Sequence, residues 1–187
     1  MKFLSDIRLL LLGLWLGAAV FFIGVAQVAF SVLPQRELAG AVVNRALSIL
    51  NISGLGIAIL LLFLSAIAAR NANKILVWLD RLLLIIVALA CAIGQFVIGF
   101  WLATVRAQMG GRPIDEFAAD DPLRVQFNQL HEYSVWVLFT GMVAGLIAFF
   151  VIANRSRTSP APATAASPSP GATTSDPFDF SKPFKKS

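Results

Sequence analysis

The sequence is poor in charged residues. Only 13% of its 187 residues are charged, whereas a typical soluble domain has about 25%. In contrast, 58% of the residues are hydrophobic and the mean hydropathy is +0.79. Because so few charges could not cover the surface of a soluble globule, the composition indicates an integral membrane protein.

Cysteine and histidine are almost absent. The one cysteine, Cys91, lies in an apolar run, so no disulfide framework is expected. One histidine, one cysteine and three methionines do not supply the three or four ligands of a zinc or copper site, so we expect no metal and no cofactor. Ser134 is the only serine close to His131, and no third group that would orient a nucleophile can be identified. We therefore expect no catalytic residues and no enzymatic activity.

Long hydrophobic runs are what the sequence does contain. Four runs predict membrane-spanning helices at about residues 9–33, 38–69, 75–106 and 122–153, each longer than the roughly 20 residues that cross the hydrocarbon. The first run is too long for a signal peptide and no small-x-small cleavage site follows it, so we expect a retained helix. Pro34 ends this helix. Asp120 or Asp121 is the expected cap of the fourth, with Pro122 in its first turn.

These runs predict an all-α membrane protein whose residues 1–154 form a four-transmembrane-helix bundle. Residues 155–187 are rich in Ser, Thr, Pro and Ala without an apolar period, which predicts a disordered tail. Ten basic residues fall on the side of the membrane that holds both termini and five on the other, which predicts cytoplasmic termini. If the protein is bacterial, the membrane is the inner or plasma membrane. A cytoplasmic partner could bind the tail. Nucleic acid is not an expected partner because the basic residues flank the apolar runs.

Small and polar residues form a stripe at helical spacing in each run. In the first run the stripe is Gly13, Gly17, Val20, Gly24, Gln27 and Ser31, and in the fourth it includes Gly141 and Gly145. Membrane helices associate through close packing and interhelical hydrogen bonds, so these stripes predict the faces that hold the bundle together. The pairs Gly13/Gly17 and Gly141/Gly145 are also the expected contacts of a homo-oligomer.

The polar members of these stripes gather in the outer half of the predicted bundle, whereas its cytoplasmic half is almost purely aliphatic and Phe. We expect a ligand-binding pocket or vestibule formed by Gln27, Asn44, Arg45, Asn51, Gln95, His131 and Ser134. Arg45 is its costliest member, since a charge at mid-bilayer costs about 2.5–3.5 kcal/mol on insertion scales. Glu37 and Glu132 are the expected partners of Arg45.

Two stretches resemble a known family. The run Trp15-Leu-Gly-Ala-Ala-Val-Phe21, followed by Phe30, Leu33 and Ala39 to Val43, is similar to the opening of the transmembrane-protein-205-like family (domain of unknown function 4149). Phe127 to Val135 resembles the F-x-x-L-H-x-x-S element at the start of that family's last helix. The resemblance spans about residues 9–153. It implies a small four-helix membrane protein of uncharacterised activity, with animal relatives linked to resistance against metal-containing drugs.

Three roles fit these features. The first is a membrane interaction or structural role, in which the polar cluster holds the bundle together and the tail recruits a partner. The second is binding or transport of a small solute or ion by an oligomer, because four helices are few for a transporter. The third is a haem or metal protein that uses His131. Convergence of Asn44, Asn51, Gln95, His131 and Ser134 on an open cavity would favour binding, whereas fully interdigitated side chains would favour the structural role.

Overall fold

The structure, a computed structural model, describes residues 2–68, 74–110 and 112–157. Helices α1 (Lys2–Val32), α2 (Arg36–Ala68) and α5 (Pro122–Arg157) are continuous α-helices. Helix α3 (Lys74–Ala92) continues through a π-helical turn, η2 (Ile93–Ile98), into α4 (Gly99–Gln108), and a short 3-10 turn covers Ile114–Glu116. Of the tail predicted over residues 155–187, residues 155–157 instead belong to α5, and residues 158–187 lie outside the described residues.

Four helical spans are long and apolar enough to cross a membrane: Phe3–Val32, Arg36–Ile67, Lys74–Gln108 and Pro122–Asn154. They confirm the predicted all-α fold with four spans. The ends differ from the prediction, because α1 begins at Lys2 rather than near residue 9 and α5 continues to Arg157 rather than ending near 153. The predicted cap of α5 is confirmed at Asp121, whose side chain accepts the backbone N–H of Leu123 at 2.8 Å.

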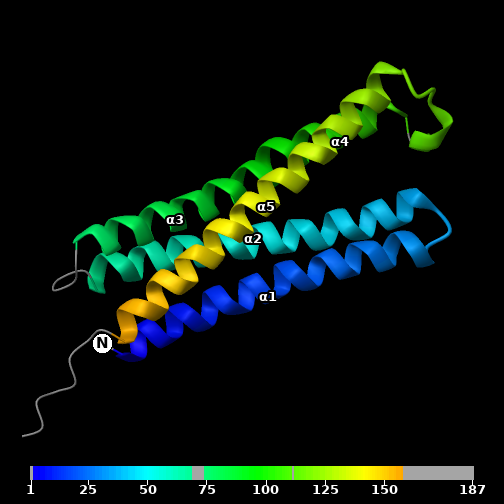
Figure 1. The fold of residues 1–187 in the computed structure, drawn as a ribbon. Helices are drawn as coiled ribbons and strands as arrows, with labels where there is room; N and C mark the ends of the chain where they lie inside the picture. The colour runs from blue at the N-terminus through cyan, green and yellow to red at the C-terminus, as the bar shows by residue number, and fades with distance from the viewer. Residues whose placement is uncertain (1, 69–73, 111, 158–187) are drawn as a thin grey trace, which may run out of the picture.

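The four spans form two helical hairpins. Helices α1 and α2 make the first hairpin, and α3 with α4 pairs with α5 in the second. Figure 1 shows the start of α1 and the end of α5 at the same end of the bundle, which we call the terminal end. At the opposite end, the loop end, residues 33–35 and 109–121 connect the helices, and the hairpins diverge (Figure 1). Helix α2 therefore contacts α3 and η2 more extensively than α4.

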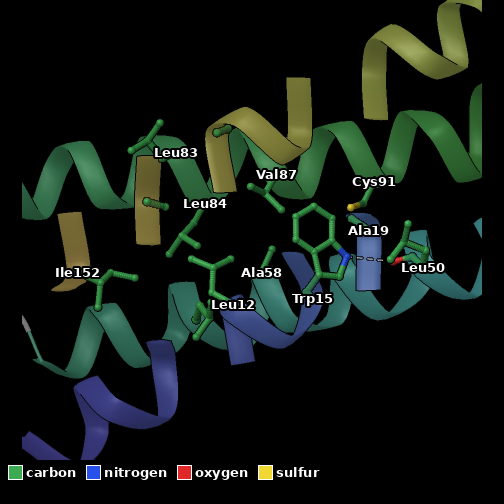
Figure 2. Packing of buried hydrophobic residues seen from close by; sticks show 13 residues of the cluster. Leu12, Trp15, Ala19, Leu50, Ala58, Leu83, Leu84, Val87, Cys91 and Ile152 are labelled. Carbon is green, nitrogen blue, oxygen red and sulfur yellow. Dashed lines mark hydrogen bonds between the residues drawn. The ribbon is translucent and has the colours of Figure 1, made fainter. Parts of the chain in front are cut away.

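All four spans meet around the indole of Trp15 in α1, which is buried (Figure 2). Its Nε1–H donates a hydrogen bond to the Leu50 carbonyl oxygen of α2 at 3.2 Å. Glycines on other helices make room for the ring. A Cβ at Gly54 of α2 would overlap the indole and lie 2.8 Å from the Cys91 sulfur of α3. A Cβ at Gly145 of α5 would lie 3.2 Å from the indole carbon Cζ3.

The glycine stripe of α5 lies inside the bundle, but the predicted stripe of α1 is not the face that packs. The inward residues of α1 are Leu12, Trp15 and Ala19. A Cβ at Gly17 or Gly24 would meet nothing within 4 Å. The physical reason is that α1 packs through its large side chains, whereas the glycines that make room for them lie on α2 and α5. The expectation that the α1 stripe holds this bundle together was wrong.

A Gly54→Ala substitution tests this packing. The added methyl group would overpack the indole, so we expect the free energy of unfolding to fall by about 1–3 kcal/mol. Gly56→Ala is the matched control on the same helix, because a Cβ there has nothing within 4 Å and alanine favours a helix by up to about 1 kcal/mol. Both values can be measured by titrating detergent micelles with sodium dodecyl sulfate and following helicity. Equal stability of the two variants would contradict the packing described.

Candidate functional site

Three of the predicted site residues line one groove between α2 and the π-helical turn η2. They are Asn44, Asn51 and Gln95. The groove has a volume of about 340 Å³, within the usual range of small-molecule sites, and we call it the amide groove. Its remaining lining residues are Leu47, Ser48, Gly94, Phe96, Gly99 and Phe100. The outer-half polar cluster of the sequence analysis therefore exists in part, as an open groove rather than as interdigitated side chains.

Asn51 is the most buried polar residue of the amide groove. Its side chain is only 5% exposed and lies near the middle of α2. Within the described part of the chain, its amide forms no hydrogen bond. Neither polar atom of the amide is fully enclosed, so the amide reaches the open space of the groove. The amide can therefore donate and accept hydrogen bonds to a molecule in the groove.

The π-helical turn shapes the wall opposite Asn51. In this turn the Gly99 N–H donates to the Gly94 carbonyl, five residues earlier instead of four. Single π turns within α-helices are frequent at functional sites. A Cβ at Gly94 would lie 3.0 Å from the Asn51 side-chain nitrogen, so glycine at this position keeps the space beside the amide open. Gln95, which is half-buried, follows directly in the same turn.

The other predicted site residues do not line the amide groove. Gln27, Arg45 and His131 are exposed on three different helices. Ser134 is buried, but its hydroxyl donates to the His131 carbonyl oxygen of its own helix at 2.9 Å. Among the described residues no ion pair joins Arg45 to Glu37 or Glu132, so the expected partners of Arg45 were wrong.

A buried ionic cluster at the terminal end corrects the expectation that this half of the bundle is apolar. Arg8 of α1 and Asp80 of α3 form an ion pair with 2.7 Å between the guanidinium nitrogen and the carboxylate oxygen, and their side chains are 3% and 0% exposed. The Ser65 hydroxyl of α2 donates to the same carboxylate oxygen at 3.0 Å. Arg81 donates to the Ser65 carbonyl oxygen at 3.4 Å. The cluster therefore connects three helices.

From the sequence, Arg8 and Asp80 are expected among the charges that flank the spans. Because α1 begins at Lys2, Arg8 already lies in its second turn, on the inward face. The signal that could have found it is spacing, since Arg8, Leu12, Trp15 and Ala19 follow steps of four, three and four. Asp80, Leu84, Val87 and Cys91 repeat the same steps in α3. Each charge thus begins the buried stripe of its helix.

At the loop end, arginine side chains extend between the two diverging hairpins. Arg36 of α2 pairs with Asp115 at 3.3 Å, and both side chains are exposed. The Arg106 guanidinium of α4 lies over Gly40 of α2, where a Cβ would be 2.9 Å from one of its nitrogens. The same guanidinium stacks 5.3 Å from the centre of the Phe127 ring, a cation–π geometry.

The four apolar spans indicate a multi-pass membrane protein, with a partly polar groove between α2 and η2. Residues 10–111 match the family described as a domain of unknown function (DUF4149), and the chain belongs to this family. The match covers the whole amide groove, Trp15 and Asp80, but not α5, so the Phe127–Val135 element lies outside it. No curated protein and no solved structure matches the chain.

The ionic cluster predicts a large effect of Asp80→Asn. This change leaves the Arg8 charge buried without its counter-ion, so we expect unfolding to become easier by about 3–5 kcal/mol. Asp115→Asn is the control, because its ion pair is exposed and such pairs contribute about 0–1 kcal/mol. The unfolding transition of each purified variant in detergent gives both values. A similar small change in both variants would show that the cluster contributes little.

Asn51→Leu distinguishes a ligand position from a structural hydrogen bond. Leucine has the same branching, and no hydrogen bond to a described residue is lost, so we expect the stability of the protein to stay the same or to rise by up to about 1 kcal/mol. Asn128→Leu on the exposed start of α5 is the control and should change stability by less than about 0.5 kcal/mol. A loss of stability in Asn51→Leu, measured in the same titration, would instead identify Asn51 as a structural residue.

Proposed function

We propose that the protein binds an uncharged, hydrogen-bonding molecule inside the membrane, in the amide groove. The observation that carries the proposal is Asn51, a residue near mid-span that is 5% exposed. Its amide reaches an open groove of about 340 Å³ and has no hydrogen-bond partner among the described residues. Polar groups within membrane spans are costly, and those that are retained mark binding sites and pathways in many membrane proteins.

The lining residues support this class of ligand. Asn44, Asn51 and Gln95 each offer a carbonyl acceptor and an N–H₂ donor, and Ser48 adds a hydroxyl that does both. The lining includes no carboxylate, imidazole, thiol or cation. This chemistry suits the recognition of hydroxyl, carbonyl or amide groups, and it favours binding over catalysis.

A purely structural role explains the amide groove less well. The ionic cluster and the packing around Trp15 already hold the helices together without it. A group that served only to fix helix positions would be expected to make its hydrogen bonds within the protein. We therefore rank binding above the membrane interaction or structural role, and above a haem or metal role for the exposed His131.

The protein could also transport the molecule that it binds. The position of the groove near the middle of α2 favours this, since the solute sites of transporters lie near the bilayer midplane. Four helices are few for transport, so we propose a homo-oligomer for that case. The open α1 face around Gly13 and Gly17 is its proposed contact, because an apolar groove of about 640 Å³ runs along it. Gly141 and Gly145 already pack inside the chain.

Topology and relatives complete the proposal. The excess of basic residues supports cytoplasmic termini, which would place the loop end on the outer side of a bacterial inner membrane or a plasma membrane. The tail would then be available to a cytoplasmic partner.

The F-x-x-L-H-x-x-S element at Phe127 to Ser134 supports an extension of the family to transmembrane-protein-205-like proteins.

Native mass spectrometry of the protein, extracted in a mild detergent, tests the binding proposal. We expect a small-molecule adduct on the wild type that is lost in Asn51→Leu, because the substitution removes both hydrogen-bonding groups of the amide. Asn128→Leu, whose side chain lies outside the amide groove, should retain the adduct. Absence of an adduct on the wild type, or equal adducts on all three proteins, would contradict the proposal.

A further inference from the structure

We infer that the ligand of the amide groove is a membrane lipid with an uncharged, hydrogen-bonding head group, and that it enters sideways from the bilayer. This inference rests on the proposed function and adds the ligand's class and its route. Four observations carry it: the depth of the groove, the residues at its opening, the contacts at the loop end and the absence of charge in its lining.

The amide groove lies deep in the membrane. Asn51 is the 16th of the 33 residues of α2, so it lies close to the middle of that span. Asn44 is seven residues nearer the loop end, or about 10 Å along the helix axis. With a hydrocarbon core of about 30 Å, both amides fall within the hydrocarbon rather than at the head-group level. A ligand that reaches them must therefore cross or reside in apolar surroundings.

The opening of the amide groove is apolar and aromatic. Phe96 and Phe100 are one helical turn apart, line the groove and are 63% and 67% exposed. In a membrane-spanning segment such exposed rings contact acyl chains. They offer a surface along which the chain of a bound lipid can lie while its head group reaches the amides.

The route from the loop end is more polar and more obstructed. The Arg106 guanidinium lies against Gly40 of α2. Gly40 is one helical turn nearer the loop end than Asn44, on the same side of the helix. Beyond it, the Arg36–Asp115 ion pair also extends between the hairpins. A water-soluble ligand would have to pass both arginines, whereas a lipid in the bilayer meets only the phenylalanine rings.

The lining selects an uncharged head group. A charged head would lose its hydration deep in the membrane and would find no opposite charge among the lining residues. Three amides and a hydroxyl instead offer donors and acceptors to a hydroxyl or carbonyl head. The volume of about 340 Å³ corresponds to roughly eleven water-sized groups at about 30 Å³ each. This is room for a head group together with the first part of a chain.

Photolabelling in phosphatidylcholine nanodiscs tests the inference. The probe is hexadecanol with a diazirine beside the hydroxyl group. The matched control is hexadecanoic acid with a diazirine at the same carbon, used at about pH 9 so that its carboxyl group is charged at the bilayer surface. We expect the alcohol to label residues 44–51 and 94–100, identified by peptide mass spectrometry, and the acid to leave them unlabelled. Asn51→Leu should reduce this labelling about tenfold, the effect of losing about one hydrogen bond.

Two further variants examine the opening. Phe100→Ala should reduce labelling by the alcohol several-fold because it removes part of the surface for the chain. Phe139→Ala is the control, since Phe139 is 56% exposed on α5 and does not line the groove. Labelling that is spread over exposed phenylalanines and unchanged by Asn51→Leu would overturn the inference, as would equal labelling by the acid.

A water-soluble probe separates failure of this inference from failure of the proposed function. Glycerol carries hydroxyl groups without a chain, and its binding can be measured by the rise it causes in the unfolding temperature. Stabilisation of the wild type but not of Asn51→Leu, with no labelling by hexadecanol, would retain the binding site and exclude a lipid ligand. If neither probe shows dependence on Asn51, both proposals fail.

Discussion

The structure depends on the insertion of one large side chain, Trp15, into space left by glycines on other helices. Lipid tails are as apolar as leucine side chains. Membrane helices therefore gain stability from close packing with one another rather than from removal of apolar surface from water. The indole provides this contact to α2, α3 and α5 together, through Gly54, Cys91 and Gly145, and its N–H bonds to the Leu50 carbonyl. Toward the loop end the two hairpins diverge (Figure 1).

The bundle is consequently asymmetric along its axis. At the terminal end Arg8, Asp80 and Ser65 connect α1, α3 and α2 through a buried ion pair and a hydrogen bond. Beyond Trp15, toward the loop end, α2 and the π turn separate enough to leave the amide groove. The Asn51 amide takes no part in these contacts and reaches the open groove instead. Ligand binding requires polar groups that a rigid scaffold holds in place, even where those groups do not stabilise the fold themselves.

The sequence predicted the four spans because apolar runs of this length have no other common structure in a chain so poor in charge. It predicted Asn44 and Asn51 together because residues seven apart share one helix face. It did not predict the π turn that brings Gln95 to the same groove. Two glycines five residues apart, Gly94 and Gly99, mark this turn, but such a pair does not by itself distinguish a π turn from an α-helix. By helical periodicity His131 lies close to the face of Gly145, yet His131 is exposed and Gly145 is packed. The reason is that helices cross at angles set by side-chain packing, which periodicity does not predict.

The central claim is that the amide groove is a ligand site open to the bilayer, and a density map of the protein in lipid nanodiscs at side-chain resolution tests it most directly. We predict non-protein density within hydrogen-bonding distance of the Asn51 amide that continues outward along Phe96 and Phe100. A collapsed groove, with the Asn51 amide bonded to Gln95 and no density between α2 and η2, would contradict it.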